Sequence, residues 1–359
     1  MLTDENFTDL KVKGYTVVTD VLTVEECDQT VDQYKEWLSQ FKDGEWPFSV
    51  NSLIQRYNVG NMHPTWFVRL KSKKVFAQVW KTDKLLSSVD AIAIGRPPES
   101  SDEQFSMPGD HWLHLDQNPS RDGLHAYQGA VYLERADEDD WTLHVLESSH
   151  LHFKDFYETN SRASMKSEIN LYYSFLDEEV KYMKNKGCEL KRVPVPKGGM
   201  VLWDSRLVHA NANPLKGRKN PGRWRYCVFV SMTPAIWATK EDMKKKKEAY
   251  NNAWMTTHWS SQGIMFFKTS IPSFAPREVE YPTQQPEIAK SREAKLISGA
   301  LEYDFQDGEP TGKELKPHWR KRLLPNGDDF VLDKKKLLKY GIITLAVVAG
   351  LVIFKMKRK

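Results

Sequence analysis

The feature that most constrains the fold is a series of short apolar segments separated by turn residues. They lie at positions 127–133, 141–146, 200–203 and 225–232. Each segment has the length of a strand and is too short for an ordinary helix. A chain with many short strands of this kind is typical of an all-β sandwich or barrel. We therefore expect a mainly β body.

Helices are expected around these strands. Thr23 and Glu26 form a capping box, in which each side chain bonds to the backbone of the other, and this pattern opens an amphipathic helix. In a later helix, the lysines at 244–247 indicate a solvated face. The other predicted elements are strands at 14–18 and 91–95, and helices that span 23–41, span 164–187 and start near Thr239.

Composition and charge narrow the class of protein. The chain of 359 residues is 40% hydrophobic, enough for one large globular domain or two modest ones. Of its net charge of +4, eight basic residues and one acidic residue after position 329 supply +7, so the preceding 329 residues carry −3. We therefore expect no nucleic-acid partner. Cys27, Cys188 and Cys227 show no paired spacing, which indicates free thiols in a reducing compartment.

A candidate membrane anchor lies near the C-terminus. Residues 341–354 contain no charged side chain and lie between clusters of basic residues. As a helix they reach about 21 Å, and Tyr340 with snorkelling lysines extends the span toward a bilayer core of about 30 Å. A buried core helix is the alternative. We expect a folded domain at 1–272, a polar extension or linker at 273–339, a transmembrane helix at 340–356 and a basic tail at 357–359.

The expected location follows from both ends of the chain. Residues 1–6 are polar and acidic, so they do not have the pattern of a signal peptide. A tail anchor without such a signal leaves the folded body on the cytosolic side of a membrane. The basic flanks fit the endoplasmic reticulum, the mitochondrial outer membrane or the peroxisome, and the sequence does not distinguish among them.

Two histidines and one carboxylate have the residue types of a metal site. His114 and Asp116 form a His-x-Asp pair before the strand at 127–133, and His209 follows the strand at 200–203. Two imidazoles and one carboxylate on one face of Fe(II) leave the opposite positions open for a cosubstrate and oxygen. These three residues are the predicted ligands. His111 is the competitor of His114, whereas His63, His258 and His318 have no acidic partner at ligand spacing.

An arginine is expected to hold the cosubstrate. Arg225 begins the strand at 225–232, where a fixed guanidinium binds the distal carboxylate of 2-oxoglutarate through two parallel hydrogen bonds. Arg223 is the competitor, because both arginines share the strand parity of Cys227 and alternation does not separate them. The long turn at 214–222 leaves Arg218 as a third candidate.

These motifs resemble the phytanoyl-CoA dioxygenase family of iron- and 2-oxoglutarate-dependent oxygenases. The resemblance covers about residues 8–235 and follows the same order. It rests on residues 14–27, 114–117, 127–129 with 143–150, and 198–209 with Arg225. It implies a double-stranded β-helix, or jelly roll, with flanking and inserted α-helices. The family's Pro-Gly-Ser-His turn reads Glu147-Ser148-Ser149-His150 here, which predicts an altered loop beside the substrate pocket.

The resemblance also implies a chemistry. His114, Asp116 and His209 bind Fe(II), and Arg225 binds 2-oxoglutarate. With O2, a substrate C–H bond becomes C–OH while 2-oxoglutarate becomes succinate and CO2. No catalytic acid or base beyond the metal centre is expected. Halogenation is disfavoured, because that chemistry needs the position that Asp116 takes.

The expected function is therefore a membrane-anchored dioxygenase that hydroxylates a small-molecule or lipid-like substrate. The alternative is a catalytically inactive jelly-roll binding module tethered to a membrane. The intact ligand set favours the enzyme, because a binding module has no need of three metal ligands and an arginine.

Overall fold

The described part of the chain contains short strands and flanking helices. The computed structural model describes residues 1–107, 109, 111–170, 172–267 and 271–318. The strands are β1 (Tyr15–Val18), β2 (Leu53–Ile54), β3 (Leu85–Ser87), β4 (Ile92–Gly95), β5 (His114–Leu115), β6 (Tyr127–Tyr132), β7 (Thr142–Glu147), β8 (Tyr173–Ser174), β9 (Glu189–Val193), β10 (Met200–Asp204), β11 (His209–Ala212), β12 (Arg225–Pro234), β13 (Met255–Thr256) and β14 (Phe266–Phe267). The helices are α1 (Asp4–Val12), α2 (Val24–Leu38), α3 (His63–Trp80), α4 (Phe153–Thr159), α5 (Ser161–Asn170), α6 (Asp177–Asn185), α7 (Lys240–Asn251) and α8 (Arg292–Ile297).

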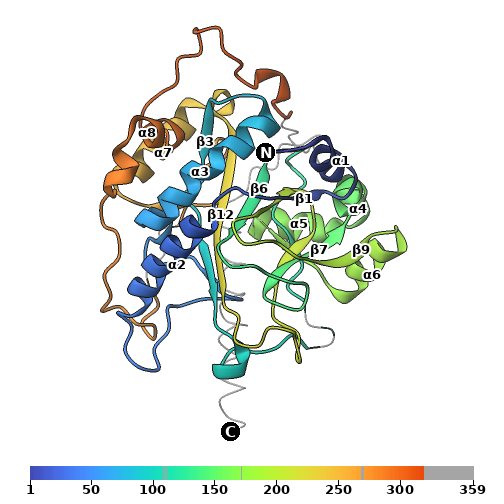
Figure 1. The fold of residues 1–359 in the computed structure, drawn as a ribbon. Coiled ribbons are helices and arrows are strands. Elements are labelled where there is room, and N and C mark those ends of the chain that lie inside the picture. The colour runs from blue at the N-terminus through green and yellow to red at the C-terminus, as the bar shows by residue number, and fades with distance from the viewer. Residues whose placement is uncertain (108, 110, 171, 268–270, 319–359) are drawn as a thin grey trace, which may run out of the picture. The chain divides into compact units, whose positions relative to one another are not determined.

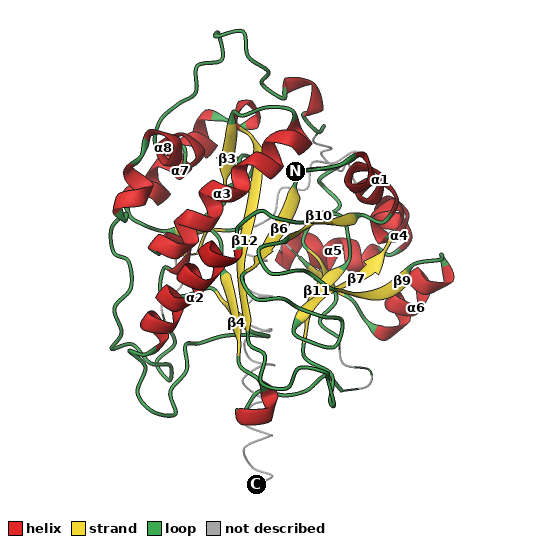
Figure 2. Cartoon of the chain, in the orientation of Figure 1, coloured by secondary structure: helices red, strands yellow, loops and turns green. Residues whose placement is uncertain are grey.

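These strands form two large antiparallel sheets (Figure 1). The first has the order β1-β10-β6-β12-β4-β2, and β3 pairs with β12. The second has the order β8-β5-β11-β7-β9, while β13 and β14 form a separate pair. Helices α2 and α3 lie over the first sheet (Figure 2). The predicted architecture, a jelly roll of antiparallel sheets with flanking helices, agrees with this arrangement.

Alternation along the strands of the first sheet separates two cores. Val131, Leu202 and Val228 belong to the apolar cluster that includes residues of α2 and α3. Their neighbours Ala130, Trp203 and Cys227 belong to a second cluster, which also contains residues of β7 and β9 from the other sheet. Since successive side chains of a strand point to opposite faces, the residues of the second cluster face the space between the sheets.

The predicted helix starts are confirmed at two capping boxes. Thr23 precedes α2 and accepts a hydrogen bond from the backbone of Glu26. Thr239 precedes α7 and accepts one from the backbone of Asp242. In both helices the side chain of the third helical residue returns a bond to the backbone of the cap, so each pair satisfies two donors that a helix start leaves open.

The prediction of one helix over residues 164–187 is wrong. Helix α5 ends at Asn170, α6 begins at Asp177, and β8 lies between them. The intervening segment pairs with β5, with His114 opposite Ser174 and Leu115 opposite Tyr173. Tertiary pairing therefore outweighs the helical spacing of the apolar residues here. This pairing helps to position the site, because β8 supports β5, the strand that carries His114.

The prediction of a fully solvated lysine run at 244–247 is also wrong at one position. Lys246 is only 1% exposed, and its ammonium group donates a hydrogen bond to the backbone carbonyl of Ser87. The run belongs to α7, and one of four consecutive helical residues commonly faces the core. Charge alone does not reveal which lysine is buried.

The segment after position 272 packs on the body at several points as far as Gly312. Ala289, Ala294 and Ile297 join the apolar cluster beneath α2 and α3, and the indole N–H of Trp37 donates to the carbonyl of Glu280 at 3.2 Å. The predicted transmembrane helix at 340–356 lies outside the described residues, as does the basic tail. Within the described ranges, no helix is long and apolar enough to cross a membrane.

Candidate metal centre

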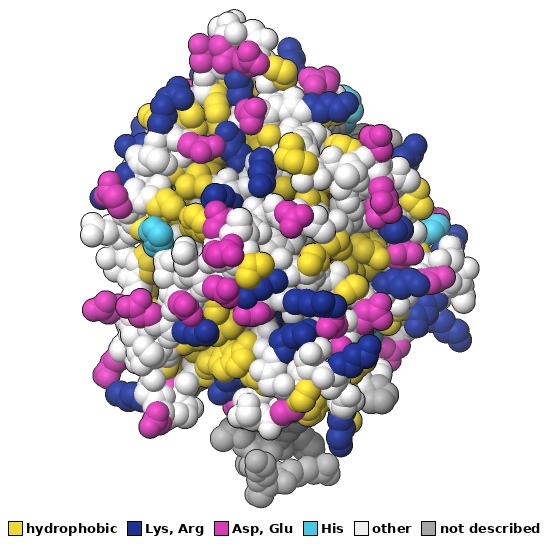
Figure 3. Space-filling model, in the orientation of Figure 1, with side chains coloured by type: hydrophobic (Ala, Val, Ile, Leu, Met, Phe, Trp, Pro, Cys, Tyr) yellow, Lys and Arg dark blue, Asp and Glu magenta, His cyan; other side chains and the backbone are white. Residues whose placement is uncertain are grey.

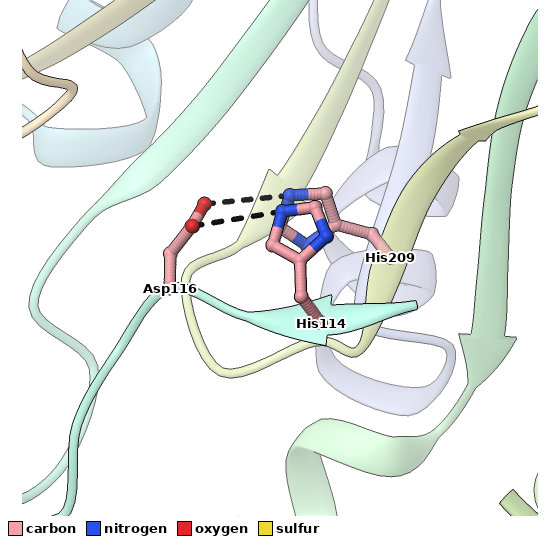
Figure 4. Close-up of side chains that lie close together, drawn as sticks. All are labelled: His114, Asp116 and His209. Carbon is pink, nitrogen blue, oxygen red and sulfur yellow. Dashed lines mark ion pairs between the residues drawn. The ribbon is translucent and has the colours of Figure 1, made fainter. Parts of the chain in front are cut away.

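The structure brings His114, Asp116 and His209 together. His114 lies on β5 and His209 on β11, and the two residues are direct partners in the antiparallel pairing of these strands. The Nε2 atom of His114 lies 3.6 Å from one carboxylate oxygen of Asp116, and that of His209 lies 3.4 Å from the other. In Figure 4 the carboxylate faces both rings. One potential ligand atom from each residue lies within 4.8 Å of the other two, a spacing that suits a single metal ion.

Backbone carbonyls fix the orientation of both imidazoles. The Nδ1 atom of His114 bonds to the carbonyl of Trp112 at 2.8 Å, and that of His209 bonds to the carbonyl of Leu207 at 2.9 Å. A carbonyl only accepts, so each Nδ1 carries a proton, and in a neutral ring with this tautomer Nε2 presents its lone pair toward Asp116. Such outer hydrogen bonds hold metal-binding histidines in the required tautomer.

The charges at the site suit a divalent cation. Burial lowers the pKa of His114 to about 4, so its ring is neutral at physiological pH. Burial acts to raise the pKa of Asp116, but His258, His114 and His209 outweigh it and hold this pKa well below its usual range. Gln128 donates a further hydrogen bond to Asp116 at 3.0 Å. Neutral imidazole and ionised carboxylate are the protonation states in which these groups bind metals, so the residues present fit Fe(II).

Arg225 lies buried on β12 and is not among the described residues that line the cavity of the metal-binding group. Its guanidinium donates to Asn211 Oδ1 at 2.9 Å and to Ser52 Oγ at 3.1 Å, and no carboxylate of the described residues lies within ion-pair distance of it. Asn211 lines the same cavity as His209, two residues away on β11. The guanidinium is therefore held by neutral partners and keeps its charge for an anion.

The two competing arginines have acidic partners elsewhere. Arg223 pairs with Asp137 at 2.8 Å and with Asp140 at 2.5 Å. Arg218 pairs with Asp140 at 3.1 Å and with Glu99 at 2.8 Å. Strand β12 begins at Arg225, so the shared parity that made Arg223 a candidate does not extend to it.

Sequence spacing missed three polar residues of the site. His258 follows β13, and its Nδ1 lies 4.0 Å from Asp116 Oδ2. Asp90 and Gln128 also line the cavity beside the metal-binding residues. None has a local motif, although Asp90 directly precedes a strand that is apolar enough to be recognised as buried. His111, the competitor of His114, instead bonds to Asp177 at 3.0 Å.

The cavity at this site has a volume of about 520 Å³. Its wall contains the metal-binding group, amide side chains such as Gln55 and Asn211, and several aromatic rings, among them Trp203 and Phe229. A cavity of this size suits a small molecule. Among the described residues that line it, none comes from the turn Glu147–His150, so the predicted effect of that turn on the pocket is wrong for this cavity.

Comparison with one solved structure supports this fold, and two further similarities were found. GlcNAc Inducible Gene 2 (GIG2) from Candida albicans matches with a TM-score of 0.59 and 16% identity, over 88% of this chain and 80% of its own. The carbocyclase SnoK from nogalamycin biosynthesis, described as non-heme and alpha ketoglutarate dependent, matches with a TM-score of 0.46 and 15% identity, over 65% of this chain and 85% of its own. In sequence, Ava biosynthesis cluster protein O from Aspergillus versicolor is 24% identical over 264 residues, which is 68% of this chain and 82% of that protein. No family model matches the chain.

The fold and the site agree with the expected class of protein. The chain has the antiparallel sheets of a jelly roll, and two histidines and one carboxylate lie close enough together to hold a metal ion. Such a ligand set is the one that the resemblance to the phytanoyl-CoA dioxygenase family implies.

Proposed function

We propose that this protein is an Fe(II)- and 2-oxoglutarate-dependent dioxygenase that hydroxylates a small-molecule substrate. The observation that carries the proposal is the set of three ligands, His114, Asp116 and His209, with both Nε2 lone pairs aimed at one point beside a cavity. Iron bound there supplies the coupling of O2 reduction to oxidation of 2-oxoglutarate and substrate. The products are succinate, CO2 and the hydroxylated substrate.

The protein's own residues bind and orient the reactants. Arg225 binds the distal carboxylate of 2-oxoglutarate, because its guanidinium is fixed by Asn211 and Ser52 and has no described acidic partner. The aromatic walls of the cavity exclude water from the substrate. No residue is needed to abstract a proton, so we assign no catalytic acid or base.

We also propose that residues 340–356 anchor the enzyme to a membrane with the catalytic body on the cytosolic side. The support is the uncharged run at 341–354 between basic clusters. The identity of the membrane, whether endoplasmic reticulum, mitochondrial outer membrane or peroxisome, is part of the test. A fluorescent fusion of the full chain should colocalise with one of them, and a matched fusion ending at Asp333 should lose that location.

Conversion of 2-oxoglutarate tests the activity. Purified full-length protein with Fe(II), ascorbate, O2 and 2-oxoglutarate should release succinate slowly even without substrate, since this class of enzyme turns over uncoupled. His209→Ala should abolish the release. His111→Ala is the matched control and should keep it, because His111 bonds to Asp177 and does not belong to the metal-binding group. Equal succinate release by wild type and His209→Ala would contradict the proposal.

A further inference from the structure

Asp90 is a buried carboxylate in the wall of the cavity. Only 9% of the residue is exposed, and it lines the same cavity as His114, Asp116 and His209. One of its oxygens accepts a hydrogen bond of 2.7 Å from the backbone N–H of Ala91. Among the described residues, no basic side chain lies within ion-pair distance of Asp90. A buried carboxylate of this kind is unfavourable unless a partner compensates it.

The backbone around Asp90 is held firmly, so the carboxylate keeps its place in the wall. The N–H of Val89 donates to Thr256 Oγ1 at 2.9 Å, and the N–H of Thr256 returns a bond to the carbonyl of Val89 at 2.8 Å. On the other side, the N–H of Phe229 donates to the carbonyl of Ala91 at 3.2 Å. Groups fixed in this way recognise ligands, because little ordering is left to occur on binding.

Arg69 acts on Asp90 without forming an ion pair with it. Burial, helped by the charge of Asp116, raises the pKa of Asp90 to about 7 against the opposing effects of the Ala91 N–H and Arg69. Arg69 is itself buried and donates to the carbonyl of Gly60 at 2.8 Å. The carboxylate is therefore poorly stabilised by the protein alone and gains from a positive ligand.

The charged and aromatic side chains of the wall suit a cationic group beside Asp90. The described residues that line the cavity include two carboxylates, those of Asp90 and Asp116, and include no lysine or arginine. Aromatic rings make up much of the remaining wall, among them Phe229, Phe266 and Trp203. The faces of such rings attract positive charge.

We propose that the substrate carries a protonated amine, or another singly charged nitrogen cation, that pairs with Asp90 inside the cavity. This inference rests on the proposed function, since it names the substrate class of the same site. The ion pair sets the orientation of the substrate, and the carbon that is hydroxylated lies on the part directed toward the metal-binding group.

Matched ligands test the charge preference. We would titrate the metal-free full-length protein at pH 8 in a calorimeter with phenethylamine, its neutral N-acetyl derivative and the anion 3-phenylpropionate. A second set consists of the same three compounds with a cyclohexyl ring in place of the phenyl ring. The amines should bind, and they should bind about tenfold or more tightly than their neutral and anionic counterparts. Equal binding within a set, or no binding by both amines, would overturn the inference.

Substitution of Asp90 tests whether this carboxylate causes the preference for amines. Asp90→Asn keeps the acceptor for the Ala91 N–H but removes the charge, so amine affinity should fall about tenfold or more while the neutral ligand is unaffected. Asp83→Asn is the matched control, because the side chain of Asp83 is 86% exposed and lies outside the cavity. Unchanged amine binding by a folded Asp90→Asn protein would overturn the inference, with folding checked by thermal denaturation.

The two proposals fail in distinguishable ways. Amine binding is measured without iron or 2-oxoglutarate, so it does not depend on activity. Uncoupled succinate release without a preference for amines would refute the proposed substrate class and support the proposed dioxygenase activity. If amines bind through Asp90 but the protein releases no succinate, the proposed activity would be refuted and the proposed binding of amines supported.

Discussion

Removal of the Arg225 guanidinium should weaken the binding of 2-oxoglutarate without affecting iron. A hydrogen bond to a charged group contributes about 1.5–3 kcal/mol, so two parallel bonds to a carboxylate contribute at least about 3 kcal/mol. At about 1.4 kcal/mol for each factor of ten, Arg225→Ala should raise the Kd for 2-oxoglutarate about 100-fold. Arg225→Lys keeps a charge but not the planar fork, and about tenfold is expected for it.

Calorimetry under anaerobic conditions measures this effect, with 2-oxoglutarate titrated into Fe(II)-loaded protein. Arg223→Ala is the matched control and should change the Kd less than about threefold, since Arg223 is paired with Asp137 and Asp140. Arg225→Ala leaves Asn211 Oδ1 without its donor, so a melting curve must show that the variant is folded. An unchanged Kd for Arg225→Ala, together with a raised Kd for Arg223→Ala, would refute the assignment.

Three further predictions concern stability and pH in the metal-free protein. Burial holds the pKa of His114 in the folded protein at about 4, below the unfolded value of about 6.5, so the unfolded chain takes up a proton first as the pH drops. The melting temperature should therefore fall between pH 6.5 and pH 4. A rise over this range would contradict the buried, neutral ring. The pKa of Asp90 is raised to about 7, so ionisation opposes folding above pH 4, and Asp90→Asn should melt at a higher temperature than wild type at pH 8. Lys246→Ala should destabilise the protein by about 1–3 kcal/mol in urea unfolding, whereas Lys247→Ala, an exposed neighbour, should change stability by less than about 0.5 kcal/mol.

Local patterns predicted much of this fold. The capping box at Thr23 places a helix start, because the pattern names both partners of a short-range hydrogen-bond pair, and the predicted helix start near Thr239 is also confirmed. Strands 127–132, 200–204 and 225–234 follow from apolar runs between turns. Residues 164–187 were mispredicted because the pairing of β8 with β5 depends on a strand far along the chain, which helical periodicity does not register.

Part of the candidate site could likewise be predicted from the sequence, and part could not. The residues His114 and Asp116 share a motif, and His209 follows a recognisable strand, so all three could be proposed from sequence. Asp90 and His258 reach the cavity only through the pairing of segments around Val89 and Thr256, and nothing in their own sequence context marks them. The choice among arginines likewise needed the acidic partners that the fold gives to Arg223 and Arg218.

The most direct test of the central claim is the visible spectrum of the protein with Fe(II) and 2-oxoglutarate under anaerobic conditions. If His114, Asp116 and His209 hold the metal with open positions for the keto acid, a charge-transfer band should appear and saturate at one equivalent of each. Asp116→Ala should remove it. A folded wild-type protein that shows no band, or a band that persists in Asp116→Ala, would contradict the account.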